Sequence, residues 1–368
     1  MTAAELVVIG AGPAGASAAL IAARAGRPVM LLERQTEPGD AICGGFLSWR
    51  TLAQLDRLGI SSADLRGHVV NGMSIFHRGR VLNRALPGSG MGLSRRRLDG
   101  LLLQAARDAG ADARLGVMVQ AITGRDIRLR GDAVIHGDCI MLATGKHDLR
   151  DLGRTVAASD PELGLRLRLP PSQSRTALIG DRIELHLFDR AYVGLILQED
   201  GSANLCLAAR TSLLAEAEGR PAELLARLAD RSPALAERMA GWSPAMAVDA
   251  IARLPYGWRV TRTAPGLYRL GDQAAAISSL AGEGMGIALA SAASAVTHWM
   301  AHGAAGAPEW QAGFARQVRR PVATAETIKR LATEQGLGNR IALQLMRLPG
   351  AARGIAQLTR VPSSLTGA

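Results

Sequence analysis

The stretch Leu6-Val7-Val8-Ile9-Gly10-Ala11-Gly12-Pro13-Ala14-Gly15 decides the fold. Its first four residues form a continuous apolar run rich in β-branched side chains, which indicates a buried parallel strand. An alanine-rich segment from Ala14 to Ala25 follows and stops at Gly26, as an α-helix does. A second apolar segment, from Pro28 to Glu33, completes a strand-helix-strand unit.

The glycines of this stretch match G-x-G-x-x-G, the pattern of a dinucleotide-binding turn between a strand and a helix. Gly10 permits the tight turn, Gly12 lets a pyrophosphate approach the backbone, and Gly15 lets the helix pack closely on the strand. The helix N-terminus then faces the phosphates. With Pro13 and Ala14, these glycines are predicted to bind a dinucleotide cofactor.

Glu33 ends the second predicted strand, where a carboxylate accepts hydrogen bonds from ribose hydroxyls. The same negative charge repels a 2′-phosphate, so NADP is disfavoured and FAD or NAD remains. The neighbouring Arg34 is predicted to lie beside the adenine rather than to bind a 2′-phosphate.

A second signal lies far along the chain. A predicted strand ends at Gly271-Asp272, and Gly282-Glu283-Gly284-Met285 opens a helix that runs from about Glu283 to Met300. An Asp at a strand end can accept hydrogen bonds from ribityl hydroxyls, and glycines at a helix start present backbone amides to a flavin ring. Another buried strand, Cys139 to Ala143, runs into Thr144-Gly145.

A pattern of short strands and turns lies between the predicted α/β segments. Residues 69–76 and 80–86 flank His77-Arg78-Gly79 like a hairpin, and residues 182–188, 192–197 and 203–208 resemble neighbouring strands. This pattern predicts an antiparallel sheet inserted into the α/β scaffold. His186 alternates with the apolar residues Leu185 and Leu187, so it either faces solvent or contacts a substrate.

Three landmarks together resemble the FAD-dependent superfamily that contains geranylgeranyl reductases and para-hydroxybenzoate hydroxylase. They are Gly10 to Gly15, Arg95-Arg96-Arg97-Leu98-Asp99, and Gly271-Asp272 followed by Gly282-Glu283-Gly284. The resemblance covers roughly the first 300 residues and implies bound FAD. It also implies that Arg95 and Thr144-Gly145 lie near the cofactor, that Cys43-Gly44-Gly45 borders the isoalloxazine, and that a cavity separates flavin and inserted sheet.

The resemblance implies a mixed α/β fold with a Rossmann-type, glutathione reductase-like FAD-binding domain, an inserted antiparallel substrate domain and C-terminal helices. The expected FAD-binding parts are residues 1–66, 93–155 and 250–302. The expected substrate parts are residues 67–92 and 156–249, and residues 303–368 form a helical extension.

Cys43-Gly44-Gly45 and Gly282-Glu283-Gly284 are most similar to the geranylgeranyl reductase branch. That branch carries Tyr-x-Trp-x-Phe-Pro on its substrate sheet, whereas residues 192–197 here are Tyr-Val-Gly-Leu-Ile-Leu. Hydroxylases of the superfamily carry Asp-Gly in place of Thr144-Gly145, and Pro in place of Ser279. The loss of both hydroxylase landmarks favours hydride chemistry.

The sequence therefore predicts an FAD-dependent oxidoreductase that acts on a carbon-carbon bond of a hydrophobic small molecule, either isoprenoid or polyketide-like. Cys43-Gly44-Gly45 is expected beside the flavin, and His186 and Tyr192 are expected to contact the substrate. One alternative is a monooxygenase that hydroxylates an aromatic or polyketide substrate through a flavin hydroperoxide. Another is a flavin-binding protein that docks a membrane or partner through basic C-terminal helices. The reductant is NAD(P)H or another electron carrier.

Composition and charge bear on the class of protein and on its partners. The chain has 368 residues, a net charge of +11 and 48% hydrophobic residues, a balance typical of a globular protein. Its positive charge is almost entirely arginine without a dense block, so we expect no nucleic-acid partner. Three cysteines without metal-ligand spacing predict no metal site.

The absence of a signal-peptide pattern predicts a cytoplasmic protein, with peripheral membrane contact as an open alternative. The sequence does not determine the oligomeric state.

Overall fold

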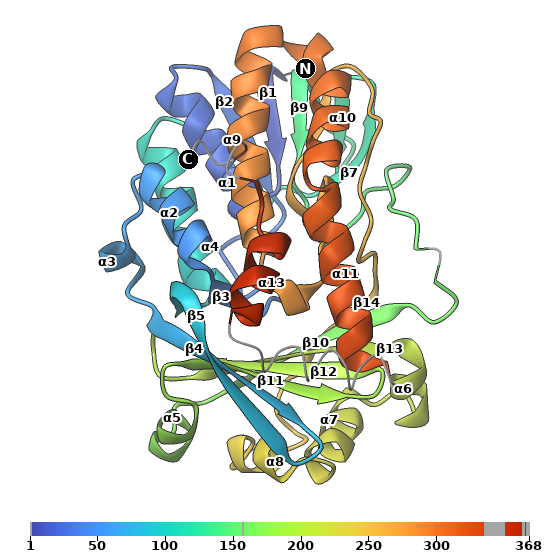
Figure 1. Cartoon of the computed structure of the whole chain (residues 1–368). Helices are drawn as coiled ribbons and strands as arrows, with labels where there is room; N and C mark the ends of the chain where they lie inside the picture. The colour runs from blue at the N-terminus through green and yellow to red at the C-terminus, as the bar shows by residue number, and fades with distance from the viewer. Residues whose placement is uncertain (1, 157, 335–349, 363–364, 366–368) are drawn as a thin grey trace.

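The computed structural model describes residues 2–156, 158–334, 350–362 and 365. Two β-sheets carry the architecture, one above the other in Figure 1. The first has the order β6-β2-β1-β9-β8-β7, and β15 pairs with β9. Its strands are β1 (Thr2–Ile9), β2 (Val29–Glu33), β6 (Asp112–Leu115), β7 (Val119–Thr123), β8 (Asp126–Leu129), β9 (Val134–Leu142) and β15 (Leu267–Arg269).

The centre of the first sheet is parallel, as the apolar strands predict. β1 lies between β2 and β9, parallel to both. Leu6 and Val8 point to one apolar cluster, and Val7 and Ile9 point to another on the opposite face. Both faces of β1 are therefore buried, which explains why its sequence is apolar without alternation. The strand extends back to Thr2 because its pairing with β9 continues there.

Helices cover the Leu6 face of this sheet. The helix α1 (Pro13–Arg24) packs against α4 (Arg95–Asp108) and α9 (Gly284–His302). Shorter helices α2 (Trp49–Arg57) and α3 (Ser62–Leu65) lie on the α4 side in Figure 1. Ala, Gly and Ser dominate the helix contacts, so the backbones approach closely.

The C-terminal helices are part of this first unit. They are α10 (Ala307–Gln317), α11 (Arg319–Thr333) and α13 (Ala351–Thr359). Trp310 and Phe314 of α10 and Val322 of α11 belong to the same apolar cluster as Leu6. The predicted extension from residue 303 contains helices in its described part, and these helices pack into the first unit because their aromatic side chains complete the core of the first sheet. Part of this predicted extension lies outside the described residues.

The second sheet has the order β14-β10-β13-β12-β11-β4-β5-β3. Its strands are β3 (Phe46–Leu47), β4 (His68–His77), β5 (Arg80–Gly92), β10 (Glu162–Leu169), β11 (Arg182–Phe188), β12 (Ala191–Leu197), β13 (Ala203–Arg210) and β14 (Asp249–Leu254). The predicted hairpin and the three predicted strands are confirmed. The sheet also runs through β14, past the expected boundary at residue 249.

One pair departs from the predicted antiparallel arrangement, because β4 and β11 are parallel. The chain passes through the first sheet between these two strands, so no hairpin fixes their relative direction. The remaining neighbours in this sheet are antiparallel.

Four short helices cover one face of the second sheet, shown at the bottom of Figure 1. They are α5 (Gln173–Ile179), α6 (Thr211–Glu216), α7 (Pro221–Asp230) and α8 (Pro233–Arg238). Leucines of β10 and β13 pack against leucines of α7 and α8 there. The other face is left for the first unit and for the cavity described below. Among the described residues, no helix is long and apolar enough to span a bilayer.

Candidate active site

A cavity of about 710 Å³ is lined by residues from both sheets. This volume suits a small-molecule site. Nearly all predicted cofactor residues line it, although they come from six separate segments of the chain: Gly10, Gly12, Pro13, Ala14, Glu33, Arg34, Arg95, Thr144, Gly145, Gly271, Asp272, Gly282, Glu283, Gly284 and Met285. The exception is Gly15, which lies behind the turn.

The glycine turn is too tight for side chains. A Cβ on Gly15 would lie 1.8 Å from the carbonyl oxygen of Gly10. Gly10 itself has φ +100°, and a Cβ there would lie 2.5 Å from the oxygen of Ala143 on the neighbouring strand end. Gly15 therefore acts through packing, while Gly10 and Gly12 border the cavity.

Donors suited to a pyrophosphate gather at this turn. The N-cap of α1 is Gly12, and no side chain among the described residues caps it, so first-turn amides are available to a ligand. The Arg95 guanidinium lies 3.2 Å from the position of a Cβ on Gly12. Asp99 holds it through two hydrogen bonds of 2.9 and 2.7 Å. Burial alone would lower the pKa of Arg95, but the Asp99 carboxylate raises it above its usual value.

Glu33 lies beside the same turn. Its carboxylate accepts hydrogen bonds from the amides of Ala11 (2.8 Å) and Gln35 (2.9 Å). A carboxylate has about four acceptor positions, so it retains capacity for ribose hydroxyls. Arg34 instead donates to the ring nitrogen Nε2 of His147, at 2.8 Å.

Lys146 is a site residue that the sequence analysis missed. Its ammonium donates to the carbonyl of Ile42 at 3.0 Å and lies 3.6 Å from Asp272. It is one of only two lysines in the chain and directly follows Thr144-Gly145, which is the signal that was available. It links the strand end of β9 to the loop that carries Cys43.

The loop with Cys43, Gly44 and Gly45 is fixed to the second sheet. The carbonyl oxygen of Cys43 accepts from the side-chain amide of Asn204 on β13, at 2.9 Å. Gly45 has φ +75°. All three residues line the cavity, and Cys43 carries a free thiol.

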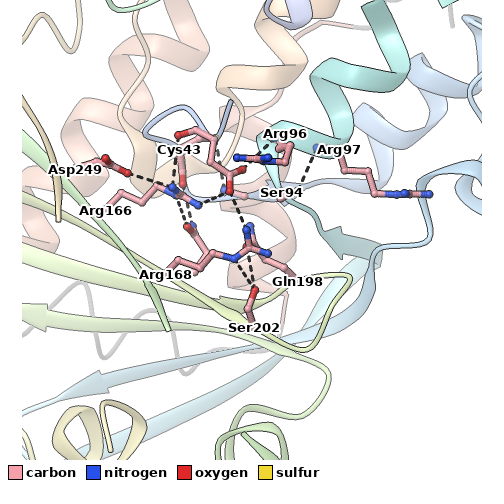
Figure 2. A network of polar contacts seen from close by, with 12 residues as sticks. Cys43, Ser94, Arg96, Arg97, Arg166, Arg168, Gln198, Ser202 and Asp249 are labelled. Atoms are coloured by element: carbon pink, nitrogen blue, oxygen red, sulfur yellow. Dashed lines mark hydrogen bonds and ion pairs between the residues drawn. The ribbon is translucent and has the colours of Figure 1, made fainter. Parts of the chain in front are cut away.

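A network of polar contacts anchors the same loop (Figure 2). Arg166 and Arg168, both on β10, reach Asp40 at 2.9 and 3.1 Å. Arg166 also contacts Asp249 at 3.2 Å. The loop thereby joins the first unit to the second sheet.

Glu283 has a different role from the one expected of a flavin-facing side chain. Its carboxylate accepts from Arg360 at 2.8 Å and from the amide of Val361 at 3.1 Å. Burial raises the pKa of Glu283, and Arg360 opposes that rise. Thr359 and Arg360 also line the cavity. Glu283 therefore fixes the C-terminal segment to the cavity wall.

The prediction that His186 contacts the substrate is not supported by its position. It pairs across the sheet with Val193, on the face that the short helices cover. Its Nε2 lies 3.3 Å from buried Glu184, and its ring stacks on Phe76 at 4.4 Å. The predicted alternation of side chains along β11 is confirmed, but only the packing of the short helices decides which face of the sheet they cover.

The opposite face of β11 and β12 does line the cavity. Ile183, Leu185, Tyr192 and Gly194 lie there, with Cys206 of β13 beside Gly194. A Cβ on Gly194 would meet no atom closer than 3.7 Å. The second sheet thus presents a largely apolar wall with an open position at Gly194.

Comparison with known proteins agrees with this geometry. Residues 3–133 match the family model described as FAD binding domain. The chain is 30% identical over 304 residues to a menaquinone reductase of Mycobacterium tuberculosis, covering 77% of this chain and 73% of the relative. It is 27% identical over 306 residues to digeranylgeranylglycerophospholipid reductase 2 of Methanopyrus kandleri, with 76% and 73% covered.

Among solved structures, Pseudomonas aeruginosa PqsL in complex with 2-aminobenzoylacetate superposes with a TM-score of 0.74 at 15% identity. The alignment covers 93% of this chain and 99% of PqsL, which shows a shared fold. The glycine turn, the uncapped helix α1, Arg95 and the carboxylate of Glu33 form a donor and acceptor set that fits FAD. The chain belongs to the superfamily of FAD-dependent oxidoreductases that includes geranylgeranyl reductases and para-hydroxybenzoate hydroxylase.

Proposed function

We propose that this flavoenzyme reduces a carbon-carbon double bond in the apolar chain of an isoprenoid substrate. The observation that carries the proposal is the wall of β11 and β12, where Ile183, Leu185 and Gly194 continue the cofactor cavity as an apolar surface. Such a surface binds hydrocarbon by removing it from water. The names of the menaquinone and digeranylgeranylglycerophospholipid reductases support the same class of substrate.

The chain's own residues have separable tasks in this reaction. The α1 amides and Arg95 hold the pyrophosphate, and Glu33 holds the ribose. FAD, when bound and reduced, would supply a hydride to one carbon of the double bond, and a proton from solvent would complete the other carbon. Ile183 and Leu185 exclude water and orient the chain of the substrate against the cofactor side of the cavity.

The test uses the FAD-loaded protein, reduced anaerobically with dithionite because the natural electron donor is unidentified. The substrate is a menaquinone with an unsaturated isoprenoid chain, and the product is analysed by mass spectrometry after reoxidation in air. Reoxidation reverses reduction of the quinone ring but not of the chain. A stable gain of two hydrogen atoms supports the proposal, whereas recovery of unchanged menaquinone contradicts it.

A second arm supplies labelled dioxygen to the reduced protein with the same substrate. Labelled oxygen in the product would replace the proposal with the monooxygenase alternative. The variant Gly194→Leu should retain FAD absorbance but lose turnover of the isoprenoid, because its side chain would project into the open position of the wall. Unchanged turnover by this variant would place the reacting chain elsewhere.

A further inference from the structure

Three hydroxyl groups meet in the otherwise apolar wall of the cavity. Two of the three tyrosines of the chain, Tyr192 and Tyr256, hydrogen-bond to the hydroxyl of Ser279. The Tyr256 oxygen lies 2.8 Å from Ser279 Oγ. All three residues line the cavity, and apolar side chains including Leu187 and Leu280 surround them. We call these three residues the hydroxyl cluster.

Proton counting shows what the hydroxyl cluster offers to a ligand. Three hydroxyls carry three protons, and two hydrogen bonds between them use two. One proton remains, and within the described residues no further side-chain or backbone group makes a hydrogen bond of good geometry with the three hydroxyls. Burial raises the pKa of both Tyr192 and Tyr256 above their usual value, so the phenols stay protonated and neutral. The cluster therefore presents a hydrogen-bond donor rather than an anion.

A fourth hydroxyl, that of Ser278, lies beside Tyr192 but does not line the cavity. Ser278 is fully buried, and its Oγ has no hydrogen bond of good geometry within the described part of the chain. It nevertheless lies close enough to the Tyr192 hydroxyl to act on its pKa. A buried polar group without a partner costs about 1–3 kcal/mol. Ser278 lies behind the cavity wall, so the hydrogen-bonding capacity open to a ligand there is that of the hydroxyl cluster itself.

The charges behind the hydroxyl cluster disfavour an anionic ligand. Lys329 lies 5.2 Å from the Tyr256 ring and contacts two carboxylates, Glu162 at 2.6 Å and Glu326 at 2.7 Å. The formal charge of Lys329, Glu162 and Glu326 together is negative, and Glu162 raises the pKa of both tyrosines. Such a field disfavours a phosphate and leaves a neutral acceptor unaffected.

We propose that the hydroxyl cluster binds an uncharged carbonyl oxygen of the substrate, which makes the substrate a quinone-type ring with an isoprenoid chain rather than a phosphate-bearing prenyl lipid. This inference rests on the proposed function for the identity of the chain, but the recognition of the ring is a separate property. A hydrocarbon alone would leave the donor unsatisfied, and a phosphate would meet the negative trio.

The experiment measures binding to the oxidised, FAD-loaded protein by equilibrium dialysis, without turnover. The first probe is 2,3-dimethyl-1,4-naphthoquinone, which has two carbonyls, no chain and no position open to thiol addition by Cys43. The second probe is geranylgeranyl diphosphate, which has the chain and the charge but no carbonyl. We expect the quinone to bind and the diphosphate not to compete with it at the hydroxyl cluster.

The variants Tyr256→Phe and Ser279→Ala each remove one oxygen and should weaken quinone binding roughly 5- to 10-fold, the worth of about one hydrogen bond. Tyr268→Phe is the matched control: its hydroxyl binds the carbonyl of Gly303 in the core of the first unit, so quinone affinity should not change. Retention of FAD and the thermal midpoint show that each variant is folded. Because both phenols stay neutral, quinone affinity should be constant from about pH 6 to about pH 9.

Quinone binding within twofold of wild type in both Tyr256→Phe and Ser279→Ala would overturn the inference. Diphosphate binding that Ser279→Ala weakens would overturn it in favour of a prenyl phosphate. The two proposals fail separately: chain reduction without dependence of quinone binding on the hydroxyl cluster rejects only this inference. Dependence of binding on the cluster with no chain reduction rejects only the proposed function.

Discussion

At the scale of single residues, the cofactor site depends on glycines that have no Cβ. Gly15 lacks a Cβ because the oxygen of Gly10 occupies that position. The Gly10 oxygen and the Gly15 Cα belong to the backbone of the same short turn, so neither atom can move without disturbing the start of α1. A glycine in the middle of a helix without such a neighbour has no comparable role.

Gly15→Ala should abolish FAD retention and lower the free energy of unfolding by roughly 3 kcal/mol or more, because the clash is between backbone and Cβ. Flavin absorbance after purification and urea unfolding of the apoprotein measure the two effects. Gly100→Ala is the control. It lies within α4 with open space at its Cβ and should gain about 1 kcal/mol. A yellow Gly15→Ala protein would contradict the turn geometry.

The thiols of Cys139 and Cys206 provide a test that depends on pH. Burial raises the pKa of each to about 12. The reactive thiolate is therefore scarce until the pH approaches that value, at a fraction of roughly one in ten thousand near pH 8. We expect iodoacetamide to spare both residues in the native protein at about pH 8 and to label them after unfolding, as peptide mass spectrometry would show. Rapid native labelling of Cys206 would mean that its environment is wetter than described.

At the scale of elements, the C-terminal helices belong to the core. Trp310, Phe314 and Val322 share one apolar cluster with β1, and Arg360 contacts the start of α9 through Glu283. One alternative drawn from the sequence was that these helices dock a membrane or partner. Their packing makes them part of the first unit.

A truncation that ends at Ala307 should therefore fail to fold, rather than lose only a docking function. Burial of Trp310 and Phe314 contributes about 3–5 kcal/mol each, which together approaches the whole stability of a typical domain. Circular dichroism and flavin absorbance of the purified fragment measure the outcome. A folded yellow fragment would show that the first sheet is stable without α10 and α11 and would restore the idea of a separable extension.

At the scale of the whole molecule, buried charges join the two sheets. Asp40, in the loop before β3, contacts Arg166 and Arg168 on β10, and Arg166 also contacts Asp249. The cavity forms where these parts meet, so its shape depends on the same contacts. Breaking them should loosen the site and the stability of the fold together.

Asp40→Asn should lower the free energy of unfolding by about 3 kcal/mol, because it leaves the nearly buried Arg166 with less negative charge. The control Asp112→Asn removes an exposed pair with Arg114 and should cost less than about 1 kcal/mol. Urea unfolding followed by both circular dichroism and FAD release checks the prediction. Equal stability of the two variants would show that the two sheets are held together by apolar contacts alone.

Local chemistry determined much of the fold and the cofactor site. The turn from Gly10 to Gly15, Glu33 at the end of β2, and Gly271-Asp272 were identified in sequence because each depends on a short-range rule about backbone conformation or strand ends. The strands and helices around them follow from periodicity in the same way. The residues that the cavity brings together were largely predicted because the carboxyl ends of parallel strands meet at one edge.

Only the tertiary structure decided which face of the second sheet is covered, and hence that Leu185 lines the cavity while His186 packs beneath α8. The same is true of the parallel pairing of β4 with β11, and of the meeting of Tyr192, Tyr256 and Ser279 from three distant segments. Alternation along a strand gives two faces but cannot say which neighbour buries each one. That choice is made by long-range packing, which no local pattern encodes.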